Sequence, residues 1–127
     1  MGEWGKADPF EGVYDEPVVP PPLLVVDGDQ LLGGLAFTNA PVQNSDKIGL
    51  WINALFVLPE HRRRGIGSML VGEAETAASD ANVDELFVFT NAPILYQKLD
   101  WSIIDDTGTN TVLRKRIVAS STVNMAD

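Results

Sequence analysis

The segment of this chain best equipped for chemistry is a run of three arginines that passes into two closely spaced glycines, Arg62-Arg63-Arg64-Gly65-Ile66-Gly67-Ser68. Glycine has no Cβ and adopts backbone angles closed to other residues, so successive N–H groups of such a loop can face one concavity. A helix that begins there adds unpaired N–H groups and the positive end of its dipole. Because three guanidinium groups stand beside these donors, the segment predicts a site for a phosphate or pyrophosphate.

The residues on either side predict the elements that position this loop. Residues 50–58, LWINALFVL, are apolar except for Asn53, which predicts a central strand covered on both faces, and Pro59 ends it. After the loop, apolar residues recur with helical spacing and predict a long amphipathic helix. Its expected buried stripe is Ile66, Met69, Leu70, Ala74, Ala77 and Ala78.

The spacing of the loop excludes two common phosphate-binding motifs. No Lys-Ser/Thr pair follows the last glycine, as a Walker A loop requires, and the Rossmann pattern GxGxxG is absent. The order Val57-x-Pro59-x-x-Arg62-x-x-Gly65-x-Gly67 instead resembles the acyl-CoA signature, Q/R-x-x-G-x-G/A, of the GNAT superfamily of N-acyltransferases. The alternative is a strand, a basic turn and a helix that bind no ligand.

The resemblance implies a role for each part of this segment. The loop would hold the pyrophosphate of coenzyme A, and its residues are Arg62, Arg63, Arg64, Gly65, Ile66, Gly67 and Ser68. The strand residues that would line the pantetheine arm are Leu55, Phe56 and Val57. The backbone N–H of Phe56 or Val57 would polarise the reacting carbonyl.

A second segment, APILYQKLDW (residues 92–101), resembles the part of the family that usually ends Tyr-x-x-x-Gly-Phe. Tyr96 matches the tyrosine, which implies that it protonates the leaving sulfur, and a tyrosine pKa of about 10 keeps that proton available. A helix tyrosine packed at the surface is the alternative. Asp100 stands in place of the glycine and Trp101 in place of the final aromatic residue. Asn91 either contacts the cofactor or a water, as related residues do, or only caps the next helix.

The remaining pattern predicts a mixed sheet with two helices. A short helix is expected from Pro93, a bulge at Gly33 and Gly34, and further strands at Leu23–Val26, Leu31–Asn39, Glu85–Thr90, Trp101–Ile104 and Thr111–Val118. The strand before the long helix and the strand after it form a βαβ unit, so they should be parallel neighbours. The fold class is therefore α/β with an α+β mixed sheet. The resemblance covers about Leu23 to Val118 and implies a GNAT-like acyl-CoA N-acyltransferase fold.

Three parts are expected along the chain: an extended, acidic and proline-rich arm (residues 1–22), a GNAT-like domain (23–118) and a tail (119–127). The arm is either a loose tail or a segment that packs on a neighbour through its aromatic side chains. The family's first strand and two N-terminal helices, which normally form one wall of the acceptor site, have no counterpart in this sequence. A shortened wall, a second subunit of a homodimer or a separate partner would complete that site.

Composition limits the partners. The chain has 127 residues, which suit one domain with its own core, and its lack of cysteine and single histidine exclude disulfides and thiolate or multi-histidine metal sites. No metal is therefore expected. The net charge of −9 disfavours nucleic acid and suits a polyanionic cofactor with a cationic substrate. Because no run reaches the length of a membrane span and no signal segment opens the chain, we expect no membrane contact and a cytoplasmic location.

These observations predict an acetyl-CoA-dependent N-acetyltransferase that acts on a primary amine of a small, cationic acceptor. The alternative is a non-catalytic acyl-CoA-binding module or subunit that needs a partner to complete the acceptor site. The general base is not evident, because the central strand has no carboxylate; the candidates are Asp27, Asp29, Asp46 or a chain of waters. His61, the single histidine, is expected to be exposed.

Overall fold

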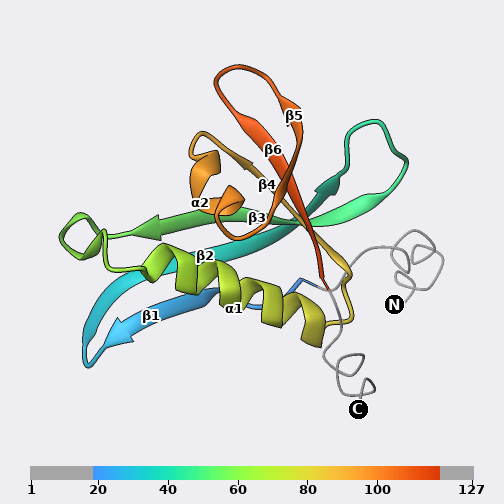
Figure 1. Cartoon of the computed structure of the whole chain (residues 1–127). Helices are drawn as coiled ribbons and strands as arrows, with labels where there is room; N and C mark the ends of the chain where they lie inside the picture. The colour runs from blue at the N-terminus through green and yellow to red at the C-terminus, as the bar shows by residue number, and fades with distance from the viewer. Residues whose placement is uncertain (1–18, 118–127) are drawn as a thin grey trace, which may run out of the picture.

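A computed structural model describes residues 19–117, which form a twisted sheet with helices packed on it (Figure 1). The strands are β1 (Leu23–Asp27), β2 (Gln30–Pro41), β3 (Ile48–Val57), β4 (Glu85–Thr90), β5 (Ser102–Asp106) and β6 (Thr111–Arg116). The helices are α1 (Ile66–Asp80) and α2 (Pro93–Gln97), with a 3-10 turn, η3 (Pro59–His61), before α1. Most of the expected arm (residues 1–22) and all of the expected tail (residues 119–127) lie outside the described residues. Neither helix of residues 19–117 combines the length and the apolar character needed to cross a bilayer.

The strands form one six-stranded sheet in the order β1-β2-β3-β4-β6-β5. β3 and β4 are parallel neighbours, and α1 is the crossover between them. The other neighbouring pairs are antiparallel. The predicted βαβ unit and the predicted mixed sheet are therefore confirmed.

α1 packs against one face of the sheet and builds the main core there (Figure 1). Ala74 and Ala78 are fully buried, and their small side chains let the helix lie close to the strands. The predicted stripe is wrong at one position, because Met69 is 47% exposed whereas Val71 is fully buried. At 100° per residue, the buried arc is centred on Ala74, and Met69 lies about 140° from that centre.

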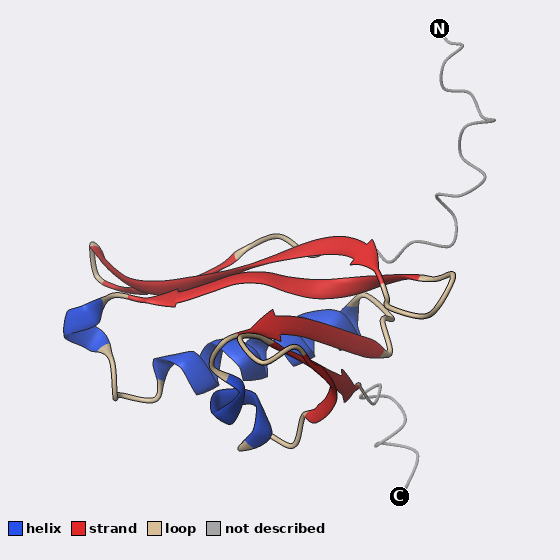
Figure 2. Cartoon of the chain, turned by 90° about the horizontal axis from the view of Figure 1, so that it is seen from above, coloured by secondary structure: helices blue, strands red, loops and turns tan. Residues whose placement is uncertain are grey.

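The opposite face of the sheet is only partly covered. Figure 2 shows both helices on the same side of β2 and β3, and no helix of residues 19–117 lies on the other side. Under the β2–β3 loop, that face buries Phe87 beside Val42. Farther along, Phe56 of β3 and Phe89 of β4 are 42% and 56% exposed. The expectation that β3 is covered on both faces is thus wrong for its carboxyl-terminal half, because apolar composition alone does not show whether a face is covered.

Two irregularities fit β2 to its neighbours. Leu32 has no partner in β1, so the bulge predicted at Gly33 and Gly34 lies one residue earlier. Gly33 is required for a different reason: a Cβ there would lie 2.6 Å from the Phe56 carbonyl oxygen. In β3, Asn53 is the extra residue opposite β2. This second bulge lies where the functional site is found.

α2 ends in a Schellman motif that has a residue other than glycine at its left-handed position. The Trp101 N–H donates to the Tyr96 carbonyl oxygen at 3.1 Å, and the Asp100 N–H donates to the Gln97 carbonyl oxygen at 3.1 Å. Asp100 accordingly has a φ of 73°. This conformation favours glycine, which gives a physical reason for the glycine in the related sequence pattern.

We expect Asp100→Gly to raise the free energy of unfolding by roughly 0.5–1 kcal/mol, because glycine adopts this φ without a Cβ clash and loses part of the gain to its unfolded-state entropy. Urea denaturation measures the difference. The matched control is Asp100→Ala, which keeps a Cβ and should not stabilise. An equal gain in both variants would attribute the effect to loss of the carboxylate instead of to φ.

Candidate functional site

β3 and β4 pair over only three residues and then separate. Their ladder joins Leu50–Ile52 to Leu86–Val88, and the extra residue Asn53 follows at once in β3. β4 remains paired with β6 as far as Thr90. Beyond Ile52, therefore, the backbone groups of β3 that face β4 have no partner in that strand. A cleft of about 450 Å³ opens at this separation.

The cleft continues towards the arginine-rich loop. A second hollow, of about 530 Å³, lies between the end of β3 and the beginning of α1. Leu55, Ala92 and Leu95 line both hollows, so the two adjoin, and we call them together the β3–β4 cleft. The residues predicted for the loop and the pantetheine arm that line it are Leu55, Phe56, Val57, Arg62, Arg63, Gly65, Ile66, Gly67 and Ser68.

The first turn of α1 faces this cleft without a side-chain cap. Gly65 is the N-cap residue, has a φ of 80°, and leaves the first N–H groups of the helix without the usual capping acceptor. Apart from its two chain neighbours, no part of residues 19–117 lies within 4 Å of the place that a Cβ on Gly65 would take, so it is the φ that favours glycine here. The first turn also has no acidic residue. The helix end therefore presents free donors and a positive dipole to an anion.

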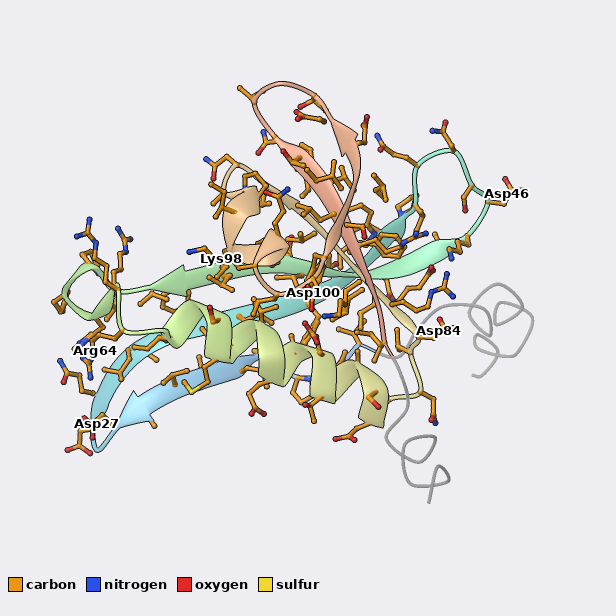
Figure 3. The ribbon with its side chains drawn as sticks, in the orientation of Figure 1. Asp27, Asp46, Arg64, Asp84, Lys98 and Asp100 are labelled. Atoms are coloured by element: carbon orange, nitrogen blue, oxygen red, sulfur yellow. The ribbon has the colours of Figure 1, made fainter. Side chains whose placement is uncertain are left out.

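The three arginines of the loop take three different positions. Arg62 Nε donates to the Val57 carbonyl oxygen at 2.9 Å, which ties this side chain to the end of β3. Arg63 lines the cleft and has a φ of 67°. Arg64 is not part of the lining: its Nη1 lies 2.8 Å from His61 Nδ1, and Figure 3 shows it on the side of the loop nearer the β1–β2 turn. The fold thus directs Arg62 and Arg63 towards the cleft and Arg64 away from it.

Tyr96 lines the cleft from α2 and is only 3% exposed, so the alternative of a tyrosine packed at the surface is wrong. Its ring packs edge-on against Trp101, with centroids 5.1 Å apart. Trp101 Nε1 in turn donates to Glu75 of α1 at 3.1 Å, which holds α2 against α1. Burial raises the pKa of Tyr96 to about 12, because the phenolate would lose its hydration. The hydroxyl therefore keeps its proton at neutral pH and is able to donate a hydrogen bond.

Burial of Tyr96 predicts a loss of stability at alkaline pH. The pKa rises from 10.0 to about 12 on folding. The resulting stabilisation is fully present below the unfolded pKa and is lost between about pH 10 and 12, by roughly 2–3 kcal/mol. Tyr96→Phe should lack this part of the pH dependence of the unfolding free energy. In a pH titration followed by phenolate absorbance, the variant should lack the step near pH 12. An identical titration curve would contradict the prediction.

Three asparagines surround the cleft where the strands separate. Asn53 of β3, Asn91 after β4 and Asn110 before β6 all line it. Within the described part of the chain, no side chain caps α2, so the interpretation of Asn91 as a helix cap is wrong. Sequence reasoning missed Asn110, because only the pairing of Thr90 with Thr111 brings the β5–β6 loop to this place. The one local indication that Asn110 could belong to the site was its position directly before a strand.

No carboxylate within residues 19–117 lines the β3–β4 cleft. Asp27 ends β1 and Asp46 lies in the β2–β3 loop, at opposite ends of the structure in Figure 3, and Asp29 lies in the β1–β2 turn. The sequence candidates for a general base therefore do not meet at the cleft.

The prediction for His61 is also wrong: the side chain is buried, with 8% exposure. The 3-10 turn causes this, because the His61 N–H donates to the Leu58 carbonyl oxygen at 2.8 Å and the chain folds back on the end of β3. A turn of three residues has too short a pattern to be recognised in the sequence.

Comparison with known proteins identifies a family whose model matches this chain. A family model described as an acetyltransferase (GNAT) domain matches residues 22–103. A search of curated protein sequences returned no match.

The fold is also similar to several solved structures. The KacTA–DNA complex contains a chain that is 20% identical, with a TM-score of 0.66 over 82% of this chain and 72% of that one. The PaiA N-acetyltransferase of Thermoplasma acidophilum, in complex with coenzyme A, is 18% identical, with a TM-score of 0.61 over 76% and 61%. YncA of Salmonella typhimurium, with acetyl-CoA, is 13% identical, with a TM-score of 0.65 over 78% and 65%. This chain spans less than two thirds of the last two, and at these identities the similarity shows the fold alone.

Proposed function

The chain belongs to the GNAT acetyltransferase family, and from this premise we propose that it is an N-acetyltransferase that uses acetyl-CoA to acetylate a primary amine of a small, cationic acceptor. The observation that carries the proposal is the β3–β4 cleft. It runs from the uncapped N-terminus of α1 to the point where β3 and β4 separate, and Tyr96 lines its inner part.

The residues of the cleft suit coenzyme A. Unpaired N–H groups at the start of α1, together with Arg62 and Arg63, would hold the pyrophosphate. Leu55, Phe56 and Val57 would line the pantetheine arm, and Asn91, which lines the inner part of the cleft, would contact the cofactor. Coenzyme A or acetyl-CoA is bound in the PaiA and YncA structures, which supports the same cosubstrate here.

Acetyl-CoA would supply the acyl thioester, and the chain would supply hydrogen-bond donors. Backbone N–H groups of β3 beyond the bulge, those of Phe56 or Val57, would polarise the carbonyl. The Tyr96 hydroxyl would donate to the departing sulfur. Because its pKa of about 12 exceeds the thiol value of about 8.5, complete proton transfer to the sulfur is uphill. We therefore assign the main effect of Tyr96 to hydrogen bonding of the developing thiolate.

The acceptor is the less constrained partner. Asn53 and Asn110 flank the inner cleft and offer both amide donors and acceptors to an amine and its neighbouring groups. Since no carboxylate of residues 19–117 lines the cleft, we propose that the amine loses its proton through water. A net charge of −9 would attract a cationic acceptor through the overall field, and for the same reason we propose neither nucleic acid nor a membrane as the partner.

Thiol release from acetyl-CoA tests this function. The full chain should release thiol only in the presence of an acceptor, when assayed against polyamines, aminoglycosides and amino-acid amines. Calorimetric titration of acetyl-CoA is run on the same preparation. Binding with acceptor-dependent release supports the transferase, whereas no binding to a folded chain would overturn it.

A second function has its own support. The partly uncovered face of the sheet suits an acyl-CoA-binding module whose acceptor site a second subunit or another partner completes, and so does the lack of a carboxylate from residues 19–117 at the cleft. Binding of acetyl-CoA without thiol release across the acceptor panel would favour this alternative.

A further inference from the structure

The single histidine of the chain is buried beside the loop, and its two ring nitrogens have different environments. Nδ1 lies 2.8 Å from Arg64 Nη1. Nε2 is buried and has no hydrogen-bond partner among the described residues. His61 itself is 8% exposed, although the three arginines that follow it are exposed.

The contact with Arg64 determines the tautomer of the imidazole. A guanidinium group has N–H donors and no acceptor, so Arg64 must donate and Nδ1 must accept. The proton of a neutral ring is then on Nε2. A ring protonated on both nitrogens would place two donors, both on cations, against each other, and the contact would be lost.

This contact flanks the most constrained point of the loop. Arg63 has a φ of 67° and Gly65 a φ of 80°, so two of three successive residues are in the left-handed region. Glycine adopts this region readily, whereas arginine does so at a cost. On one side, Arg62 Nε is bonded to the Val57 carbonyl oxygen at 2.9 Å; on the other, Arg64 is bonded to His61. Arg63, which lines the cleft, therefore lies between two arginines whose side chains are both hydrogen-bonded to the protein.

We infer that His61 is a positioning residue: it accepts a hydrogen bond from Arg64, turns that arginine away from the cleft, and thereby holds the loop in the shape that presents Arg63 and the N-terminus of α1 to a pyrophosphate. The inference rests on the proposed function for the identity of the ligand. The hydrogen bond between Arg64 and His61, by contrast, is a property of the protein without ligand. The two parts of the inference can therefore be tested separately.

The first test uses the full chain without ligand. Nitrogen–proton correlation spectra of the imidazole are free of overlap, because the chain has one histidine. In spectra recorded at about pH 8, we expect an unprotonated Nδ1 and a protonated Nε2. Arg64→Met removes the donor and keeps the apolar stem, so it should shift the ring towards a mixture of tautomers. A wild-type ring protonated on Nδ1, or no change in Arg64→Met, would overturn the inference.

The second test measures acetyl-CoA affinity by calorimetry. His61→Leu removes the acceptor and should weaken binding about tenfold, because the loop is no longer held in its binding shape before the ligand arrives. His61→Asn can place its Oδ1 near the position of Nδ1 and should recover most of the affinity. In the His61→Leu background, Arg64→Met should have little further effect, since the two residues act as one unit.

The outcomes separate the two ideas. If the wild type binds no acetyl-CoA, the proposed function fails. The tautomer of His61 still tests whether the hydrogen bond with Arg64 exists. If the wild type binds acetyl-CoA and all His61 variants bind it equally well, the Arg64–His61 hydrogen bond has no role in binding and the inference is overturned. If His61→Leu does not fold, Arg64→Met alone, at an exposed position, must show the loss of affinity.

Discussion

Gly65→Asp is expected to weaken acetyl-CoA binding by at least about a hundredfold, which is the largest effect on affinity that we predict for one substitution. Two causes act together. Gly65 has a φ of 80°, which strains any residue with a Cβ. The new carboxylate would also stand at the uncapped end of α1, where the phosphates are proposed to bind, and would repel them while occupying the donors. Calorimetric titration of acetyl-CoA into the variant and the wild type measures the change.

Two control variants separate these causes. Gly65→Asn introduces nearly the same shape without the charge, and asparagine tolerates a positive φ better than most residues. It should therefore bind more tightly than Gly65→Asp. Gly72→Asp adds the same charge to an exposed glycine farther along α1, where the added Cβ would meet nothing of residues 19–117 beyond its own helix turn, and it should bind like the wild type. Equal losses in the Gly65→Asp and Gly72→Asp variants would assign the effect to total charge and not to the loop.

Tyr96→Phe is expected to reduce kcat about a hundredfold while the Kd for acetyl-CoA changes little, since a hydrogen bond to a developing charge is worth roughly 1.5–3 kcal/mol. The buried ring keeps its edge-on contact with Trp101, so the fold should survive the substitution. The substitution removes only the hydroxyl of a residue that lines the cleft. Initial rates of thiol release with saturating acceptor, together with calorimetric binding, separate the chemical step from binding.

The pH profile of turnover and the stability of the variant together test whether the Tyr96 hydroxyl acts as a hydrogen-bond donor or the residue only packs. Burial raises the pKa of Tyr96 to about 12, so the hydroxyl should remain protonated across the neutral range and kcat should show no loss from its ionisation below about pH 10. A thermal unfolding scan of both proteins at neutral pH serves as the control for stability. Wild-type turnover in a folded Tyr96→Phe variant would remove Tyr96 from the mechanism and leave the backbone donors of β3 as the main contribution.

The sequence by itself determined the local elements and the loop that joins them. The apolar run from Leu50 and the helical repeat from Ile66 correspond to β3 and α1 within two residues, because hydrophobic periodicity and the end of a strand at Pro59 are properties of neighbouring residues. The requirement for glycine at position 65 is local in the same way, since it follows from one backbone angle. These features were sufficient for the family resemblance that the match over residues 22–103 confirmed.

Only the tertiary structure decided which side chains meet at the cleft. The sequence does not distinguish three adjacent arginines from one another. In the structure, Arg62 is bonded to the Val57 carbonyl and Arg64 to His61, so the two side chains point in different directions. Asn110 reaches the cleft only through pairing between β4 and β6. Likewise, an apolar β3 is equally consistent with a covered face and an open one, and the placement of both helices on one side leaves Phe56 exposed. Such outcomes depend on contacts between distant segments, which residue type and spacing do not specify.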